Sequence, residues 1–427
     1  MTKNRSLDHK ILALAIPAIV ANITTPLLSL VDVAIVGHLG SAAYVAAIAV
    51  GGSLFSAIYW LFGFLRFGTS GLTAQAVGAG DEAQQRIILA RSLAVALLFG
   101  TLLIILQIPV GKLALRFMDT DVPTAELAWQ YFRILIWGAP AVLMQYAMVG
   151  WFVGMQNTRA PMWNSLIINV VNIAASLLLV CVFHLGIKGI ATGTLIAQWV
   201  GMLVALFIAK PRRFPLSVLL QWSEVRHFFS INADIFLRTL CLIAVTVWFT
   251  RAGASQGAEI LAVNTLLLQL FILFSYFMDG FAFSAEALCG RYLGAGDKEG
   301  LRRCIRREVQ WGAAMALLFT AVYAIGGEAF LSLLTDDLHI MHSAAEFRLW
   351  AVGIPIAGFM AFTWDGIVIG LTRTRLMLWS MALSTAIFFI LYFSLYGRMG
   401  NHALWLAFLA YLLTRGIALW LLSRRKI

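Results

Sequence analysis

The feature that most constrains this chain is a succession of apolar segments long enough to cross a lipid bilayer. A membrane-spanning helix needs about 20 predominantly apolar residues. Apolar residues make up 61% of the 427 positions and charged residues only 12%, about half the charged share of an ordinary soluble protein. The predicted fold class is therefore an all-α integral membrane protein. Its twelve transmembrane helices are expected to begin near Ile11, Tyr44, Ile87, Thr124, Pro161, Ile187, Glu224, Gly257, Val309, His342, Leu376 and His402.

The positive charge of the chain fits this plan. There are 31 Lys and Arg residues against 20 Asp and Glu, which gives a formal net charge of +11. In a soluble protein this balance would suggest binding to nucleic acid. With the N-terminus in the cytoplasm, most of the Lys and Arg residues fall in cytoplasmic segments, as the positive-inside rule requires. We therefore expect a multi-pass protein of the bacterial inner membrane with both termini in the cytoplasm, and no nucleic-acid partner.

Motifs for enzyme chemistry, cofactors and metals do not occur in the sequence. There is no phosphate-binding loop and no HExxH motif. The four cysteines are isolated and form no CxxC pair. The first apolar segment, Ile11 to Gly37, is too long for the core of a signal peptide and is expected to remain as a span. We predict a protein that is not an enzyme and holds neither a cofactor nor a metal site.

The chain also repeats itself at a shift of about 215 residues. The segment Val77-Gly78-Ala79-Gly80-Asp81 recurs as Leu293-Gly294-Ala295-Gly296-Asp297. Further matches pair Phe132, Arg133, Gly138 and Pro140 with Phe347, Arg348, Gly353 and Pro355, and Gly150, Gly154, Arg159 and Trp163 with Gly366, Gly370, Arg375 and Trp379. Each half holds six predicted spans, so both halves enter the membrane in the same direction.

This duplication predicts two six-helix bundles related by a pseudo-twofold axis along the membrane normal. The expected division is an N-lobe over residues 1–209, a cytoplasmic linker over 210–226 and a C-lobe over 227–427. Two similar bundles around one central cleft are typical of alternating-access transporters.

A carboxylate and a proline lie close together in the first span. Ser29 and Thr25 share a helix face with Asp32, so a polar stripe runs inward from the carboxylate. Pro26 interrupts the helix hydrogen bonds and predicts a hinge beside that charge. The alternative is that Asp32 only caps the outer end of the span, where a carboxylate is less costly than at the bilayer centre.

The fifth span carries a second polar stripe. Ser165, Asn169, Asn172 and Ser176 are spaced 4, 3 and 4 residues apart, which places them on one helix face. The sixth span adds Thr194 and Gln198, four residues apart. With Asp32, these neutral oxygens and amides are able to surround a proton or a sodium ion. They also suit hydrogen bonding between helices, which is the alternative for each of them.

In the second half, carboxylates occur inside three predicted spans. Asp234 and Arg238 are four residues apart, which predicts a structural ion pair. Asp279 and Glu286 share one helix face, and Asp365 stands alone in the tenth span. Asp279 and Asp365 have no partner nearby in the sequence, whereas Glu286 has the alternative of pairing with Arg291. The three carboxylates are therefore candidates for a substrate site or a second cation site.

Several of these strings together resemble the multidrug and toxic compound extrusion (MATE) family over essentially the whole chain. They are Val31-Asp32 with Gly37-His38-Leu39-Gly40, Gly78-Ala79-Gly80 with its copy, and Asn169 with Asn172. Ala262-Val263-Asn264, Asp279-Gly280-Phe281-Ala282 with Glu286-Ala287, and Asp365-Gly366 with Ile369-Gly370 resemble its DNA-damage-inducible F branch.

The resemblance implies a cation-coupled exporter with two six-helix lobes around a V-shaped cleft. It implies that Asp32 is the proton site, with Asn172 and Asn169 as partners, and that protonation is linked to bending at Pro26. The family often has a second aspartate where this sequence has Ser176, which argues against a two-carboxylate site in the N-lobe. Asp365 matches an aspartate that members with a C-lobe cation site use.

The expected function is thus proton-coupled antiport of organic cations and amphiphiles across the bilayer, by a monomer and through alternating access. Sodium coupling through the C-lobe remains an alternative. So does the flipping of a lipid-linked cell-wall precursor, whose pyrophosphate would need several cations. The predicted spans hold more carboxylates than arginines, which favours cationic cargo.

Overall fold

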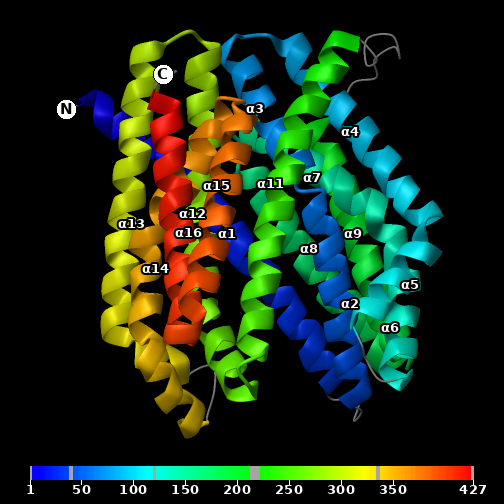
Figure 1. The fold of residues 1–427 in the computed structure, drawn as a ribbon. Coiled ribbons are helices and arrows are strands. Elements are labelled where there is room, and N and C mark those ends of the chain that lie inside the picture. Colours follow the sequence, from blue (N-terminus) through cyan, green and yellow to red (C-terminus); the bar gives the residue numbers. More distant parts are fainter. Residues whose placement is uncertain (1, 38–41, 119–121, 212–221, 333–336, 425–427) are drawn as a thin grey trace. The chain divides into compact units, whose positions relative to one another are not determined.

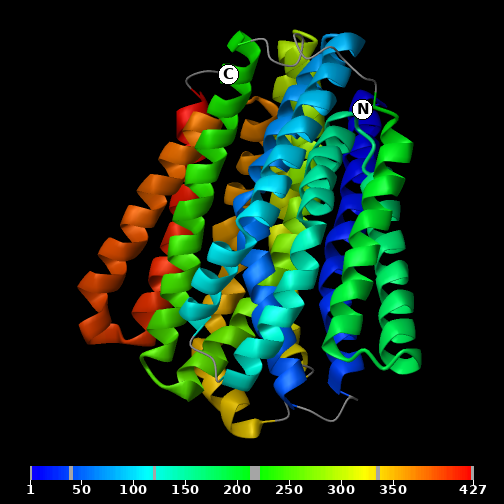
Figure 2. The same ribbon diagram turned by 90° about the vertical axis from the view of Figure 1, so that its right-hand side faces the viewer.

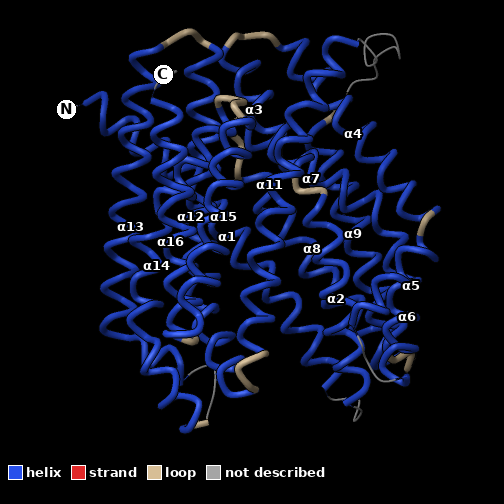
Figure 3. Tube along the Cα trace, in the orientation of Figure 1, coloured by secondary structure: helices blue, strands red, loops and turns tan. Residues whose placement is uncertain are grey.

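The computed structural model describes residues 2–37, 42–118, 122–211, 222–332 and 337–424, and every element in these ranges is helical (Figures 1 and 3). The first half contains α1 (Thr2–Gly37), α2 (Ala42–Leu61), α3 (Phe64–Gly78), α4 (Glu82–Ile105), α5 (Gln107–Met118), α6 (Val122–Leu135), η1 (Ile136–Gly138), α7 (Ala139–Gly154), α8 (Arg159–Leu177), η2 (Leu178–Val182) and α9 (Ile187–Ala209). The second half contains α11 (Trp222–Ala254), α12 (Ala258–Gly294), α13 (Lys298–Ser332), α14 (Leu338–Gly370), α15 (Thr374–Met399) and α16 (Asn401–Arg424).

Twelve stretches among the described residues are long and apolar enough to cross a membrane, which confirms the predicted number and class of elements. Most begin within a few residues of the predicted starts. The ninth differs most, because its helix begins at Lys298 and not near Val309. The basic residues that follow Lys298 are therefore the first turns of a membrane helix and not a loop.

Corresponding spans of the two halves differ in continuity. In the first half, α2 and α3 divide one span at Phe62-Gly63, and the 3₁₀ turn η1 divides the span of α6 and α7 just before Pro140. In the second half, α12 and α14 each run through without a break, although Pro355 lies inside α14. Each of α12 and α14, with 37 and 33 residues, is consequently longer than either helix of the corresponding span in the first half.

The chain divides into two compact units. One consists of residues 20–228, and the other of residues 1–19 together with 229–427. The division passes through α1 between Ile19 and Val20, seven positions before Pro26. The lobes predicted from the repeat, 1–209 and 227–427, describe the sequence duplication, and that division, its axis and the cleft between the lobes stay predictions.

The beginning of α1 packs in the unit formed mainly by the second half. Trp311 Nε1 on α13 donates a hydrogen bond to Asp8 Oδ1 at 3.1 Å, and Arg307 Nε lies 3.8 Å from the same oxygen. Gly280 on α12 lies against Ala15 and Ile19, so close that an added Cβ would clash. Polar contacts at one end and close helix packing further along thus hold this part of α1.

The duplication is visible in the local geometry of each unit. Gly80 and Gly296 both adopt positive φ, 72° and 70°, at the ends of α3 and α12. The aspartates that follow accept hydrogen bonds from backbone N–H groups, Asp81 from Gln84 at 2.9 Å and Asp297 from Gly300 at 2.7 Å. The repeated Gly-Asp string therefore forms a tight turn whose aspartate satisfies one of the otherwise unbonded N–H groups of the next helix.

The repeated glycines of α7 and α14 also have equivalent neighbours. An added Cβ at Gly150 would clash with the carbonyl oxygen of Arg66, and one at Gly366 with that of Ala282, which lies 216 positions after Arg66. Close approach of two membrane helices requires small residues at the contact. The shared glycines thus mark one helix crossing that each unit contains.

In the second half, α15 and α16 lie side by side in both views (Figures 1 and 2). Near the start of α12 and at the first residue of α16, the buried residues Asn264 and Asn401 exchange hydrogen bonds of 2.8 and 2.9 Å through their amide groups. Trp405 Nε1 donates to Asn264 Oδ1 at 2.9 Å. Asn264 of the Ala262-Val263-Asn264 string is therefore a buried interhelical link.

Candidate functional site

Three helices of the first half meet at a polar network. Ser165 Oγ on α8 lies 3.0 Å from Thr24 Oγ1 on α1. The side-chain amide of Asn169, four positions later on α8, donates to the backbone carbonyl of Thr24 at 3.0 Å. The predicted stripe on the fifth span therefore holds α1 two residues before Pro26. Thr24 was missed from the sequence, because it lies about 100° around the helix from Thr25 and so is not on the face of Asp32.

The other half of the stripe faces α9. The side-chain amide of Asn172, which is fully buried, donates to Thr194 Oγ1 at 2.9 Å. Ser176, one turn further along α8, is also fully buried. Among the described residues, neither Asn172 Oδ1 nor Ser176 Oγ has a hydrogen-bond partner. Two oxygens on one helix face are thus left able to interact with a proton donor or a small cation.

The backbones of α8 and α9 approach closely at Ser176. A Cβ added to Gly193 would lie 2.8 Å from the Ser176 backbone nitrogen. The next turn of α9 departs from the prediction, because Gln198 Oε1 lies against Gly138 of η1 and its backbone carbonyl accepts a bond from Gln145 at 2.7 Å. Thr194 therefore belongs to the network on α8, whereas Gln198 contacts the fourth span.

The side chains of Pro26 and Asp32 lie outside the described residues, as do those of Thr25 and Ser29. The backbone of α1 is helical through these positions. The roles assigned to Asp32 as the proton site and to Pro26 as the hinge therefore stay predictions.

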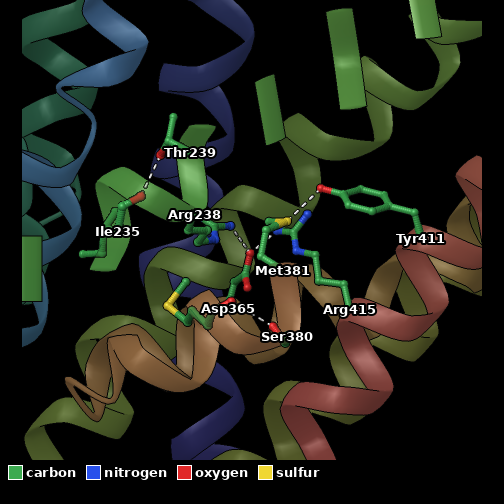
Figure 4. Close-up of polar contacts among 9 residues, drawn as sticks. Ile235, Arg238, Thr239, Asp365, Ser380, Met381, Tyr411 and Arg415 are labelled. Carbon is green, nitrogen blue, oxygen red and sulfur yellow. Dashed lines mark hydrogen bonds and ion pairs between the residues drawn. The ribbon is translucent and has the colours of Figure 1, made fainter. Parts of the chain in front are cut away.

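The main charged cluster of the second half consists of Arg238 on α11, Asp365 on α14 and Arg415 on α16 (Figure 4). Both guanidinium groups donate to the same oxygen, Asp365 Oδ2, and all three residues are buried. Figure 4 shows the two arginines reaching the carboxylate from different helices. A carboxylate with two guanidinium partners is well compensated for its burial, whereas loss of one partner would leave an uncompensated charge.

This cluster changes the expectation for Asp365. From the sequence it stood alone in its span, but in the structure two arginines surround it. The partners were missed because they lie 127 positions before and 50 positions after it in the sequence. Asp234, in turn, accepts a hydrogen bond from Thr374 Oγ1 at 3.0 Å. The predicted ion pair of Asp234 with Arg238 stays a prediction.

Asp279 and Glu286 differ in burial although they share a face of α12. Asp279 is half-buried and interacts electrostatically with Arg415 and Tyr276. Glu286 is fully buried, at the level where α12 and α14 cross at Gly370. Asp279 thus extends the cluster toward α12, and the alternative pairing of Glu286 with Arg291 stays a prediction.

One buried carboxylate was missed by the sequence analysis. Glu308 on α13 is fully buried, and its Oε1 accepts a hydrogen bond from Ser284 on α12 at 2.5 Å. Ser92, 216 positions earlier, makes the equivalent link in the first half, with its Oγ 2.7 Å from Thr69 Oγ1. Because the ninth span was expected to begin near Val309, Glu308 was placed in the loop before it. Its position 216 residues after Ser92 was the available signal.

The two halves thus present different chemistry. Among the described residues, the first-half network is neutral and rich in oxygen atoms, whereas the carboxylate of the second-half cluster is already bound by two cations. No three His, Cys, Asp or Glu side chains of the described ranges gather at one place. The first-half network is therefore the better candidate for binding a coupling ion.

Comparisons with known proteins agree with this fold. A family model described as MatE matches residues 17–178 and again residues 233–393, in register with the duplication. DNA damage-inducible protein F of Escherichia coli is 37% identical over 98% of this chain and 93% of its own length. A probable multidrug resistance protein NorM of Geobacillus kaustophilus is 26% identical over 88% of this chain and 85% of its own.

Solved structures show the same fold at low sequence identity. A MATE crystal structure in the bent conformation matches with a TM-score of 0.88 at 18% identity, over 98% of this chain and 95% of that one. A variant of the Vibrio cholerae MATE transporter VcmN matches with a TM-score of 0.84 at 20% identity, over 100% of this chain and 98% of that one.

Proposed function

This chain belongs to the MatE family, and from that membership we propose that it is a secondary active multidrug exporter of the bacterial inner membrane. Its twelve apolar helices make it a multi-pass membrane protein. Relatives over most of its length are named multidrug resistance proteins, among them MdtK of Edwardsiella ictaluri, which is 24% identical over 94% of this chain. We propose organic cations and amphiphiles as its cargo, alternating access as its mechanism, a monomer as its working form and no enzymatic activity. Both termini are proposed to lie in the cytoplasm.

We propose the proton as the coupling ion, with Asp32 as its carrier. The observation that carries this proposal is the pair of buried oxygens, Asn172 Oδ1 and Ser176 Oγ, which lack partners among the described residues. Sodium needs several oxygen ligands at once, and negatively charged oxygens bind it more strongly than neutral ones. A single carboxylate with neutral oxygens is better suited to taking up and releasing a proton.

The attachment of α1 supports a role for its bending. Asn169 and Ser165 hold Thr24, which lies between the unit boundary at Ile19/Val20 and Pro26. A bend at Pro26 would move the part of α1 that carries Asp32 relative to this attachment. Protonation of Asp32 would then favour one conformation, and release of a cationic cargo would accompany it.

Sodium coupling through the second half is the weaker alternative. Asp365, the aspartate expected to hold such an ion, already receives two guanidinium groups. The same pairing weakens the flipping of a lipid-linked precursor, because these arginines are engaged with a carboxylate and not directed to a pyrophosphate.

The test is export from proteoliposomes loaded with a fluorescent organic cation, under an imposed pH gradient or an imposed sodium gradient. We expect the pH gradient alone to drive export. Asp32→Asn should abolish it, while the matched control Asp234→Asn, which keeps a hydrogen-bonding side chain opposite Thr374, should retain it. Export that requires sodium and ignores the pH gradient, or an Asp32→Asn protein that still pumps, would overturn the proposal.

A further inference from the structure

A cavity of about 650 Å³ opens between α13 and α16, where the basic ends of both helices lie. Its floor comes from α14, against which α13 and α16 both pack. Arg302 and Arg306 line it from α13, and Arg424 lines it from α16. We call this cavity the arginine groove. None of these residues belongs to the first-half network or to the Arg238, Asp365 and Arg415 cluster.

The neighbouring arginines Arg303 and Arg307 have acidic partners, whereas the groove arginines on α13 have none among the described residues. Arg303 lies 4.0 Å from Glu299, and Arg307 lies 3.8 Å from Asp8. No acidic side chain in the described part of the chain forms an ion pair with Arg302 or Arg306, which are both exposed. The two are one turn apart, so their positive charges point to the same side of α13. The groove therefore collects cations to which the described residues offer no counter-charge.

The third arginine is held in place by an aromatic ring. The guanidinium carbon of Arg424 lies 4.5 Å from the ring centroid of Trp420, one turn earlier on α16. This cation–π contact orients the guanidinium group and leaves its N–H groups able to donate to an anion. Trp420 itself also lines the groove.

Besides its arginines and Gln310, the groove is lined by apolar side chains and two tryptophans. Ile305 and Val309 line it from the same side of α13, and Met360 lines it from α14. Trp364 of α14 also lines it and is only 4% exposed. Among the described residues, its indole N–H has no hydrogen-bond partner. A buried N–H without a partner is costly, so an acceptor atom inside the groove would stabilise it.

The occupant must therefore carry negative charge at one end and apolar chains at the other. Free phosphate would neutralise the arginines and leave Ile305, Val309 and Met360 uncovered. A zwitterionic lipid would cover the apolar part but would not neutralise the arginines. The groove also lies where α13 changes from basic to apolar sequence, as a helix does when it enters the bilayer. Basic pockets between membrane helices are suited to anionic lipid headgroups.

We propose that the arginine groove is a binding site for an anionic phospholipid of the leaflet that faces the basic helix ends. The phosphodiester is bound by Arg302, Arg306 and Arg424. An acyl chain follows Ile305 and Val309 toward Met360, and the N–H of Trp364 donates to a phosphate or ester oxygen.

The test is lipid retention by the purified full-length protein, measured by native mass spectrometry after addition of phosphatidylglycerol or phosphatidylcholine. The variant Arg302→Gln/Arg306→Gln/Arg424→Gln removes the cations. Its matched control, Arg86→Gln/Arg226→Gln/Lys298→Gln, removes the same number of positive charges at exposed or part-exposed positions outside the groove. Each arginine should contribute about fivefold to retention, so the groove variant should bind phosphatidylglycerol about a hundredfold more weakly.

The wild type and the control variant should retain phosphatidylglycerol well above phosphatidylcholine, and the groove variant should lose this preference. Trp364→Phe, which keeps the apolar surface and removes only the donor, should weaken phosphatidylglycerol binding by several-fold. Inorganic phosphate should not compete at millimolar concentration. Equal retention by the groove variant and the control would overturn the proposal, as would displacement of the lipid by phosphate alone.

Discussion

Arg238 on α11 and Asp365 on α14 form a buried ion pair across 127 positions of sequence, and Arg415 donates to the same carboxylate oxygen. Together the two contacts join α11, α14 and α16 through one oxygen atom. Because two guanidinium groups already compensate the carboxylate, we expect it mainly to hold these helices together. This relationship gives the first prediction.

Asp365→Asn should destabilise the protein by about 3–5 kcal/mol, because it leaves two buried guanidinium groups without a negative partner. The control is Asp279→Asn, since Asp279 is only half-buried and its loss should cost less. Thermal unfolding of the purified variants in detergent measures the difference. If Asp365→Asn unfolds at the wild-type temperature, the cluster does not support the fold.

Ser176→Ala should reduce export with little effect on stability, whereas Ser92→Ala should reduce stability with little effect on export. Ser176 Oγ has no partner among the described residues, so its removal should change stability by less than about 0.5 kcal/mol and should reduce proton-driven export. Ser92 Oγ lies 2.7 Å from Thr69 Oγ1, so Ser92→Ala should cost about 1 kcal/mol and leave export intact. Thermal unfolding and liposome export are measured on both proteins, and unchanged export with Ser176→Ala would remove this hydroxyl from the coupling site.

The two helix crossings at the repeated glycines should respond alike to an added methyl group. Gly150→Ala and Gly366→Ala each place a Cβ against a backbone carbonyl, which should cost about 1–3 kcal/mol. At Gly52 and Gly397 an added Cβ meets nothing within 4 Å, so Ala there should stabilise the helix by up to about 1 kcal/mol. The unfolding temperatures of the four variants test this difference, and equal shifts for all four would contradict the crossing geometry.

Pro26→Ala should leave the protein folded, because the change restores a helix hydrogen bond in a membrane helix. Export should nevertheless fall, since a straight α1 resists the bend that we associate with protonation of Asp32. The control is Pro355→Ala, which also removes a proline from inside a membrane helix, α14, but lies outside α1. Normal transport by Pro26→Ala would separate the proline from the mechanism.

Local patterns in the sequence predicted the helices and much of the first-half network. The stripe Ser165, Asn169, Asn172 and Ser176 was predicted to share one face, and its first three members make side-chain bonds to α1 or α9. Such predictions succeed because the period of an α-helix is fixed, so spacing along the sequence determines which residues face the same side. The repeat likewise predicted equivalent positions, and Gly150 and Gly366 occupy them.

The sequence by itself therefore determined the number of spans, their apolar character, the duplication and the polar faces of single helices. Only the tertiary structure decided which side chains meet across helices: Asp365 with Arg238 and Arg415, Glu308 with Ser284, and Gln198 with Gly138 in place of α8. The physical reason is the distance along the sequence over which each effect acts. Helix periodicity acts over a few residues, whereas the partner of a buried charge is set by how separate helices pack, and that packing brings together positions far apart in the chain.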